Sequence, residues 1–239
     1  MPEEINRLLT DQIADLLFTP SPDAGENLIA EGIPRERIRF VGNVMIDSLQ
    51  KNLKAAREQH TREQLQLNDT DYALLTLHRP SNVDEQQAFV RILDALEQIA
   101  TRLPIIFPIH PRTRKMIDEL GLEHRVSRIS NLRLIEPIGY LDFLRLTSRA
   151  RLVLTDSGGI QEETTVLGIP CITLRENTER PITVEVGTNT IAGTDTARII
   201  EAALRVLDNR PDKSRLRIPE LWDGKTADRI LDALVEANG

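Results

Sequence analysis

The chain has 239 residues, 40% of them hydrophobic, which is enough to bury the core of one or two domains. Its formal net charge of −7 argues against a nucleic-acid or membrane-surface partner, and no apolar run is long enough to span a bilayer. The single cysteine, Cys171, argues against a disulfide framework or a thiolate zinc cluster, so we expect a cytoplasmic protein.

The predicted elements alternate between helices and strands along most of the chain. The N-terminal part is expected to form helix, strand, helix and strand at residues 3–15, 17–19, 24–31 and 38–41. The polar segment 47–66 is given no element. Later strands are predicted at residues 73–77, 105–109, 132–135, 151–154, 171–174 and 189–191. Later helices are predicted at residues 85–101, 113–120, 140–148, 158–167, 181–185, 196–207 and 226–237.

Short apolar runs between helical segments are typical of strands that are buried on both faces. They predict an α/β fold, a Rossmann-like doubly wound parallel sheet with helices on each side. Ligands of such sheets bind beyond the carboxyl ends of the strands, so polar residues at those ends are the candidates for a functional site.

The most informative stretch is Asp156-Ser157-Gly158-Gly159-Ile160-Gln161-Glu162-Glu163, which follows a predicted strand. A helix that begins at two glycines leaves unpaired backbone N–H groups at the strand end and lets a ligand approach closely. Ser157 can cap this helix or bind an anion, and Glu163 could meet the polyol part of a nucleotide. The stretch suits a diphosphate, although taken alone such a common turn favours a capped helix without a ligand.

Other basic residues follow strands at the same expected edge of the sheet. His78 and Arg79 come after the first strand of the regular series, His110 after the second, and Arg180 in the loop after the fifth. Each alone has a plain alternative, either a loop histidine or a surface salt bridge. Together with a helix N-terminus they favour a nucleotide or sugar-phosphate site.

With Gly168-Ile169-Pro170 after it, the stretch at 156–163 resembles the signature of the non-hydrolysing UDP-N-acetylglucosamine 2-epimerases. The resemblance covers the whole chain, and further matches occur in family order at residues 2–7, 42–43, 76–79, 108–111, 179–181 and 223–225. Hydrolysing relatives do not carry the stretch intact, which favours the non-hydrolysing branch.

The resemblance implies the glycosyltransferase-B arrangement of two Rossmann-like domains, and an enzyme that is usually a homodimer and needs no cofactor or metal. Pro2-Glu3-Glu4 matches a motif well inside the first domain. We therefore expect the chain to lack most of that domain, with two catalytic carboxylates, and to be nearly inactive alone. Residues 1–42 would be its tail and residues 43–239 the UDP-binding domain, with the terminal helix packing back on the N-terminal part.

The activity that the resemblance implies is the isomerase reaction from UDP-GlcNAc to UDP-ManNAc, a nucleotide-sugar step that feeds polysaccharide biosynthesis. UDP is eliminated to give 2-acetamidoglucal and is then added back from the other face. Three alternatives stay open: an epimerase of another UDP-acetamido sugar, a glycosyltransferase of the same fold, and a non-catalytic module that binds nucleotide sugars.

Individual roles carry over as expectations. Glu3 matches the family's acid/base position, and His78 matches the histidine near the diphosphate. Phe143 falls where an aromatic ring packs on uracil, with a core phenylalanine as the alternative, while Ile138 departs from the polar residue of some members.

The remaining matches concern binding. The substrate-binding positions of the family fall on Ser157, Gly158, Gly159, Glu163 and Arg180. Arg79 and His110 resemble residues that hold a second UDP-GlcNAc as an activator in some bacterial members.

Overall fold

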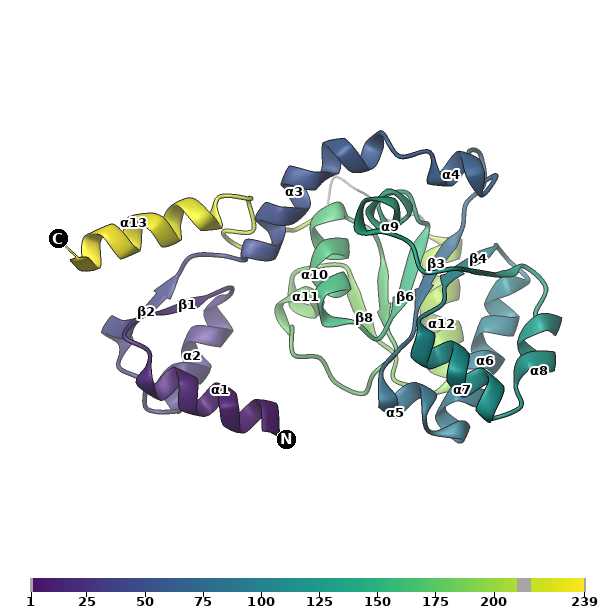
Figure 1. Ribbon diagram of the computed structural model, residues 1–239, viewed down its shortest axis with the longest axis horizontal. Coiled ribbons are helices and arrows are strands. Elements are labelled where there is room, and N and C mark those ends of the chain that lie inside the picture. Colours follow the sequence, from purple (N-terminus) through teal and green to yellow (C-terminus); the bar gives the residue numbers. More distant parts are fainter. Residues whose placement is uncertain (1, 210–215, 239) are drawn as a thin grey trace. The chain divides into compact units, whose positions relative to one another are not determined.

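The computed structural model describes residues 2–209 and 216–238, with side chains from residue 4 to 237 outside the gap (Figure 1). It divides into a small unit, Met1–Lys51 with Ile218–Gly239, and a large unit, Asn52–Arg217. No described helix is both long and apolar enough to cross a bilayer.

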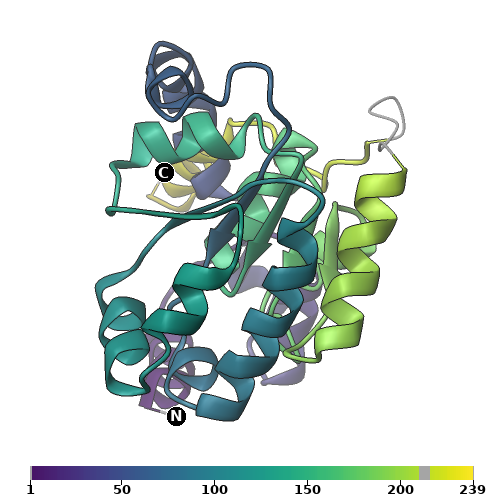
Figure 2. The same ribbon diagram turned by 90° about the vertical axis from the view of Figure 1, so that its right-hand side faces the viewer.

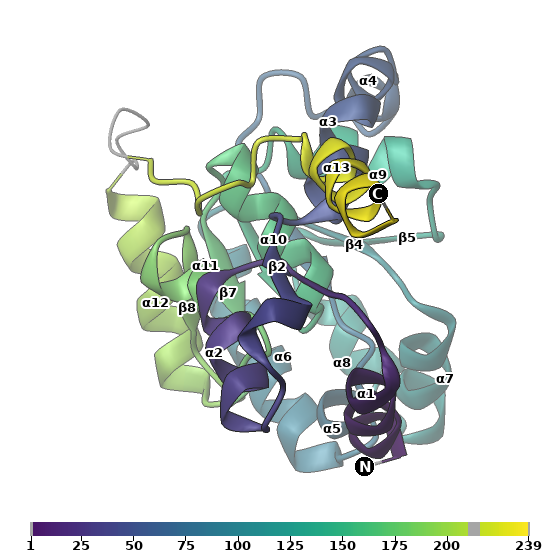
Figure 3. The ribbon, with the colours of Figure 1, turned by 90° about the vertical axis from the view of Figure 1, so that its left-hand side faces the viewer.

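The small unit is a short β-α-β crossover with further helices before and after it. Its strands β1 and β2 pair in parallel, and Figure 3 shows α2 beside β2. Leu17, Leu28 and Ile33 form its buried apolar cluster. The bounds are α1 (Pro2–Ile13), β1 (Leu17–Thr19), α2 (Pro22–Ala30), η1 (Arg35–Arg37), β2 (Ile38–Phe40) and α13 (Thr226–Asn238), and α3 (Val44–Arg57) begins in this unit.

The large unit is built on six parallel strands in the order β5-β4-β3-β6-β7-β8. The strands are β3 (Ala73–Thr76), β4 (Ile105–Pro108), β5 (Leu132–Ile135), β6 (Leu152–Thr155), β7 (Cys171–Thr173) and β8 (Asn189–Ile191). This is the doubly wound order, and the predicted fold class is confirmed. The direction of winding reverses between β3 and β6, which is where such sheets bind ligands.

Successive residues of a strand point to opposite faces of the sheet, and in the inner strands both sets are apolar. Helices therefore cover both faces. Leu75 packs in one buried cluster with residues of α6 and α12, which Figure 2 shows side by side. Leu74 packs in a second cluster, with residues of α9 and α10 on the other face. The helices are α6 (Gln86–Ala100), α7 (Pro111–Glu119), α9 (Tyr140–Thr147), α10 (Gly158–Leu167), α11 (Ile182–Glu185) and α12 (Thr196–Asp208).

Four α-helices are not predicted from the sequence: α3, α4 (Thr61–Gln64), α5 (Pro80–Val83) and α8 (Glu123–Arg128). The polar average composition of the segment 47–66 hides its helical period. The segment contains most of α3, which has a narrow apolar stripe that includes the fully buried Ile46 and Leu49. The other three helices have four to six residues and are too short to show a helical period.

Candidate active site

The candidate site lies at the carboxyl ends of β3 and β6, the two strands at which the winding reverses. Their register pairs Thr76 with Thr155, and the two hydroxyls lie 2.6 Å apart. Asp156 follows Thr155 directly and His78 follows Thr76 after one residue, so strand pairing brings the two close together.

Asp156 is a fully buried carboxylate that organises the loop after β3. The backbone N–H groups of His78 and Arg79 donate to its Oδ2 at 2.9 and 2.8 Å, and the Asn82 amide donates at 3.3 Å. Nδ1 of His78 lies 3.0 Å from Oδ1. Burial raises the pKa of Asp156, but the hydrogen bonds from His78 and Arg79 outweigh it, and the net pKa lies below the usual value.

An ionised Asp156 fixes the tautomer of His78, because a carboxylate can only accept. The proton therefore sits on Nδ1 of His78, and Nε2 is left for a ligand. Sequence reasoning quoted Asp156 in the motif but gave it no role. A carboxylate directly after a buried strand, at the expected binding edge, was the signal that could have identified it.

The helix α10 starts at Gly158, and Gly159 is its second residue. Ser157 occupies the predicted capping position. Its side chain makes no capping hydrogen bond among the described contacts, and its N–H donates to Thr155 Oγ1 at 3.0 Å. A Cβ at Gly159 would meet no atom within 4 Å. The first-turn N–H groups thus remain for an anion that can approach over open space.

Arg180 and Glu179 lie beside this helix. Nε of Arg180 donates to Oε1 of the buried Glu162 at 2.6 Å. A Cβ at Gly158 would lie 3.7 Å from Oε2 of Glu179, whose carboxylate accepts from Arg175 at 2.8 Å. Two neighbouring loop residues of opposite charge, Glu179 and Arg180, therefore lie near the N-terminus of α10.

Glu163 is buried and accepts a hydrogen bond from the Tyr140 hydroxyl at 3.0 Å. Burial raises the pKa of Glu163, Tyr140 lowers it in part, and the nearby charge of Glu162 raises it further. Burial and the Glu163 charge also raise the pKa of Tyr140. Sequence reasoning did not assign Tyr140 to the site, because this contact depends on how α9 packs against α10.

We expect Glu163→Gln to raise the free energy of unfolding at pH 7 by about 0.5–2 kcal/mol, the usual range for a stabilising substitution. An acid whose pKa is raised on folding destabilises the folded chain above that pKa, and this penalty disappears as the pH falls below it. The gain should therefore shrink in acid, which urea unfolding at several pH values would measure. Glu162→Gln is the matched control and should lose stability, since it weakens the bond to Arg180; a loss with Glu163→Gln would contradict the prediction.

An apolar pocket of about 280 Å³ adjoins the Asp156 cluster. His78 and Ser157 line it from the segments after β3 and β6, His110 from the start of α7, and Phe143 from α9. The rings of His78 and His110 have their centroids 5.4 Å apart. Ile138 also lines the pocket, so its wall is apolar where the departure from the family pattern was noted.

Phe143 lines the pocket and packs against the second core cluster, as the alternative predicted, and its contact with uracil stays a prediction. His110 caps α7, its Nδ1 accepting from the N–H of Arg112 at 3.1 Å. A guanidinium nitrogen of Arg79 lies 4.0 Å from a carboxylate oxygen of Glu179. The side chain of Glu3 lies outside the described residues, so its acid/base role stays a prediction.

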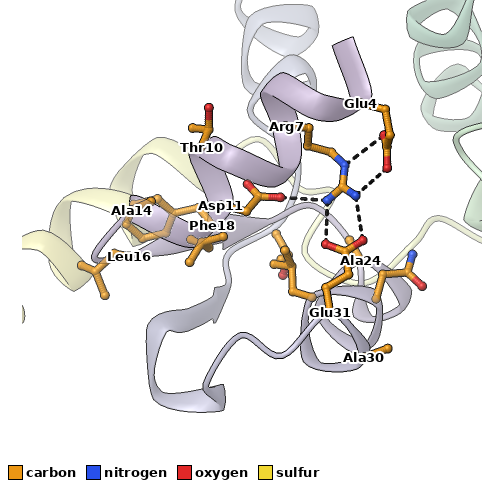
Figure 4. A pocket seen from close by; sticks show the side chains of 14 residues that line it. Glu4, Arg7, Thr10, Asp11, Ala14, Leu16, Phe18, Ala24, Ala30 and Glu31 are labelled. Atoms are coloured by element: carbon orange, nitrogen blue, oxygen red, sulfur yellow. Dashed lines mark hydrogen bonds and ion pairs between the residues drawn. The ribbon is translucent and has the colours of Figure 1, made fainter. Parts of the chain in front are cut away.

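A larger hollow, of about 750 Å³, lies within the small unit (Figure 4). Arg7 donates there to Glu4 at 2.7 Å, Asp11 at 2.8 Å and Glu31 at 2.7 Å. Hydrogen bonds from Arg7 lower the pKa of Glu4 and Glu31 below the usual value. Three carboxylates already surround this cation, so the hollow does not suit a phosphate. Among the described residues no group of three or more histidine, cysteine or acidic side chains is arranged to hold a metal ion.

Comparison with known proteins agrees with this geometry. The sequence model of the UDP-N-acetylglucosamine 2-epimerase family matches residues 1–235. The chain belongs to this family. One relative, the UDP-N-acetylglucosamine 2-epimerase of Methanocaldococcus jannaschii, is 44% identical over 98% of this chain and 64% of its own length. Another, the UDP-2,3-diacetamido-2,3-dideoxy-D-glucuronate 2-epimerase of Pseudomonas aeruginosa, is 41% identical over 85% of this chain and 55% of its own length.

Solved structures of family members have the same fold. The M. jannaschii UDP-GlcNAc 2-epimerase, in complex with UDP-GlcNAc and UDP, matches with a TM-score of 0.88 and 43% identity over 99% of this chain and 65% of its own. The Neisseria meningitidis enzyme bound to UDP-GlcNAc matches with a TM-score of 0.84 and 31% identity over 98% and 65%. The chain therefore spans slightly less than two thirds of the length of these structures, which have the glycosyltransferase-B type of fold predicted from the sequence.

Proposed function

We propose that this epimerase-family chain binds the UDP part of UDP-GlcNAc at the β3–β6 edge and serves its epimerisation at C2 to UDP-ManNAc. The observation that carries the proposal is the pairing of His78 with an ionised Asp156 beside the open N-terminus of α10. A diphosphate there would accept from backbone N–H groups and from Nε2 of a His78 that is protonated on both ring nitrogens, since Nδ1 faces Asp156.

In the proposed reaction a base removes the hydrogen at C2, and the bond from C1 to the diphosphate oxygen breaks, giving 2-acetamidoglucal and UDP. UDP then adds back after the glucal is protonated on the other face. His78 and Arg180 stabilise the charge that develops on the leaving diphosphate, Glu163 holds the ribose hydroxyls, and Phe143 packs on uracil. Glu3 is the proposed acid/base group on the small unit.

Other parts of the proposal come from the sequence alone. Residues 43–239 are proposed as the UDP-binding domain and residues 1–42 as part of a second Rossmann-like domain. The roles of Arg79 and His110 at an activator site, the homodimer and the cytoplasmic location stay predictions.

We expect Arg180→Ala to weaken UDP binding by about 1.5–3 kcal/mol, the value of one charge-assisted hydrogen bond, and to leave uridine binding unchanged. Glu163→Ala should weaken both ligands, because its proposed contact is to ribose. Calorimetry with the purified chain measures all four affinities. Arg205→Ala is the control for loss of one surface charge. In the described contacts the Arg205 side chain pairs only with Glu201, on the exposed face of α12. Equal UDP affinity of Arg180→Ala and the unsubstituted chain would remove Arg180 from the site.

A second candidate function is epimerisation of a different UDP-acetamido sugar. It is supported by the 41% identity to the P. aeruginosa enzyme, whose name specifies a diacetamido-glucuronate substrate. A screen of product formation over several UDP-sugars separates the two. Similarity to a wall teichoic acid polymerase is limited to the fold, at 16% identity and a TM-score of 0.52.

A further inference from the structure

Arg180 is held at both polar groups of its own main chain. Its N–H donates to Oγ1 of Thr178 at 3.0 Å. Its C=O accepts from the hydroxyl of Thr183 at 2.7 Å. Two side-chain hydroxyls therefore fix the backbone of the one residue in this loop that the proposed function places against a diphosphate.

Both hydroxyls lead to the same buried pair of amide side chains. The Thr178 hydroxyl donates to Oε1 of Gln161 at 2.6 Å. Nδ2 of Asn189 donates to Oγ1 of Thr183 at 3.0 Å and to Oε1 of Gln161 at 3.1 Å. These bonds close a ring through Arg180, Thr178, Gln161, Asn189 and Thr183. Each hydroxyl donates once and accepts once, and Asn189 uses both of its amide hydrogens.

The ring is anchored on the sheet and on the site helix. Gln161 is fully buried in α10, and Asn189 is buried in β8, where its Oδ1 accepts from Thr173 of β7 at 2.7 Å. The Arg180 side chain also bonds to α10, through Glu162. The ring restrains the main chain of Arg180, since breaking any of its bonds leaves a further polar group unpaired beside Nε2 of Gln161, which has no partner among the described residues. The guanidinium itself is held by Oε1 of Glu162 at 2.6 Å and by the C=O of Glu179 at 3.0 Å. Ring and side-chain bonds together hold the guanidinium relative to α10.

We propose that Gln161, Thr178, Thr183 and Asn189 are positioning residues that preorganise Arg180 for the diphosphate. This inference rests on the proposed function, because it assumes that Arg180 binds the ligand. The four residues act through Arg180 and make no ligand contact of their own. Holding the arginine in place before binding removes the entropy cost of ordering a long side chain in the complex.

A double-substitution cycle tests the inference. Thr178→Val keeps the shape of the side chain but removes both ring bonds, and we expect it to weaken UDP binding about tenfold in the otherwise unchanged chain. In an Arg180→Ala background the same substitution should have no further effect on the UDP dissociation constant. Thr178→Ser restores the hydroxyl and should restore the affinity. Thr183→Val enters the ring from the opposite side and should cause a smaller loss of the same kind, because the N–H of Thr183 still donates to the Arg180 C=O at 3.0 Å.

Thr188→Val is the matched control, because this hydroxyl also bonds to a backbone carbonyl, that of Ile169, but lies outside the ring. It should bind UDP as the unsubstituted chain does. A Thr178→Val chain with normal UDP affinity, or with the same loss in both backgrounds, would overturn the positioning role. Equal affinity of the Arg180→Ala chain and the unsubstituted chain would instead overturn the proposed function, and that result is visible before any ring variant is made.

Discussion

Asp156→Ala should lose about 3–5 kcal/mol of unfolding free energy, the cost usual for removing one partner of a buried charged pair. The substitution leaves the backbone N–H groups of His78 and Arg79 without their acceptor, and the Asn82 amide keeps only its bond to the C=O of Leu174. Urea unfolding followed by circular dichroism measures the loss. Asp156→Asn keeps the shape and one acceptor oxygen, so it should lose less.

The unsubstituted chain and Asp156→Ala can also be compared over a range of pH. The pKa of Asp156 is lowered on folding, so its contribution is complete above the pKa of an unfolded aspartate, about 3.9, and is lost as the pH falls through the folded value. The stability difference between the unsubstituted chain and Asp156→Ala should therefore be constant near neutral pH and shrink in acid. Equal stability of the two chains at pH 7 would show that the carboxylate does not organise the loop.

Gly159→Leu should abolish most UDP binding while leaving the fold intact. A Cβ at this position would meet no atom within 4 Å, so there is room for a side chain, and we expect leucine to cover the first-turn N–H groups of α10. We expect at least about a tenfold loss of UDP affinity, since one charge-assisted hydrogen bond is worth about 1.5–3 kcal/mol. Stability should stay the same or rise by up to about 1 kcal/mol, because leucine favours helices more than glycine does.

The control for this substitution is Ala197→Leu. Ala197 is the exposed second residue of α12, so it has the same helix position as Gly159 but follows β8, two strands away from β6. Its replacement should change neither quantity. Undiminished UDP binding by Gly159→Leu, measured by calorimetry beside thermal unfolding, would contradict a diphosphate at this helix.

The four inner strands of the large unit could be predicted because they are short apolar runs that are almost entirely buried. The bounds of the edge strands β5 and β8 also agree with the predicted ones, although these strands are partly exposed. The contact between Glu163 and Tyr140 could not be predicted, because it depends on the packing of two helices. The position of Asp156 after a buried strand was a usable signal, but its partners could not be predicted, because they depend on β6 lying beside β3 and spacing along the chain does not give strand order.

The two glycines of the signature were predicted to begin the helix, and Gly158 and Gly159 are its first two residues. Their value is the missing side chain, which keeps the approach to the N–H groups open.

The contacts of Asp156 also have a consequence for folding. Its bond to the N–H of His78 joins residues 78 positions apart in the sequence, and the two lie on strands from opposite halves of the sheet. Bringing such distant segments together is entropically costly and belongs to the late stage of assembly. We therefore expect the anion site, and with it nucleotide binding, to form only after β3 and β6 have paired.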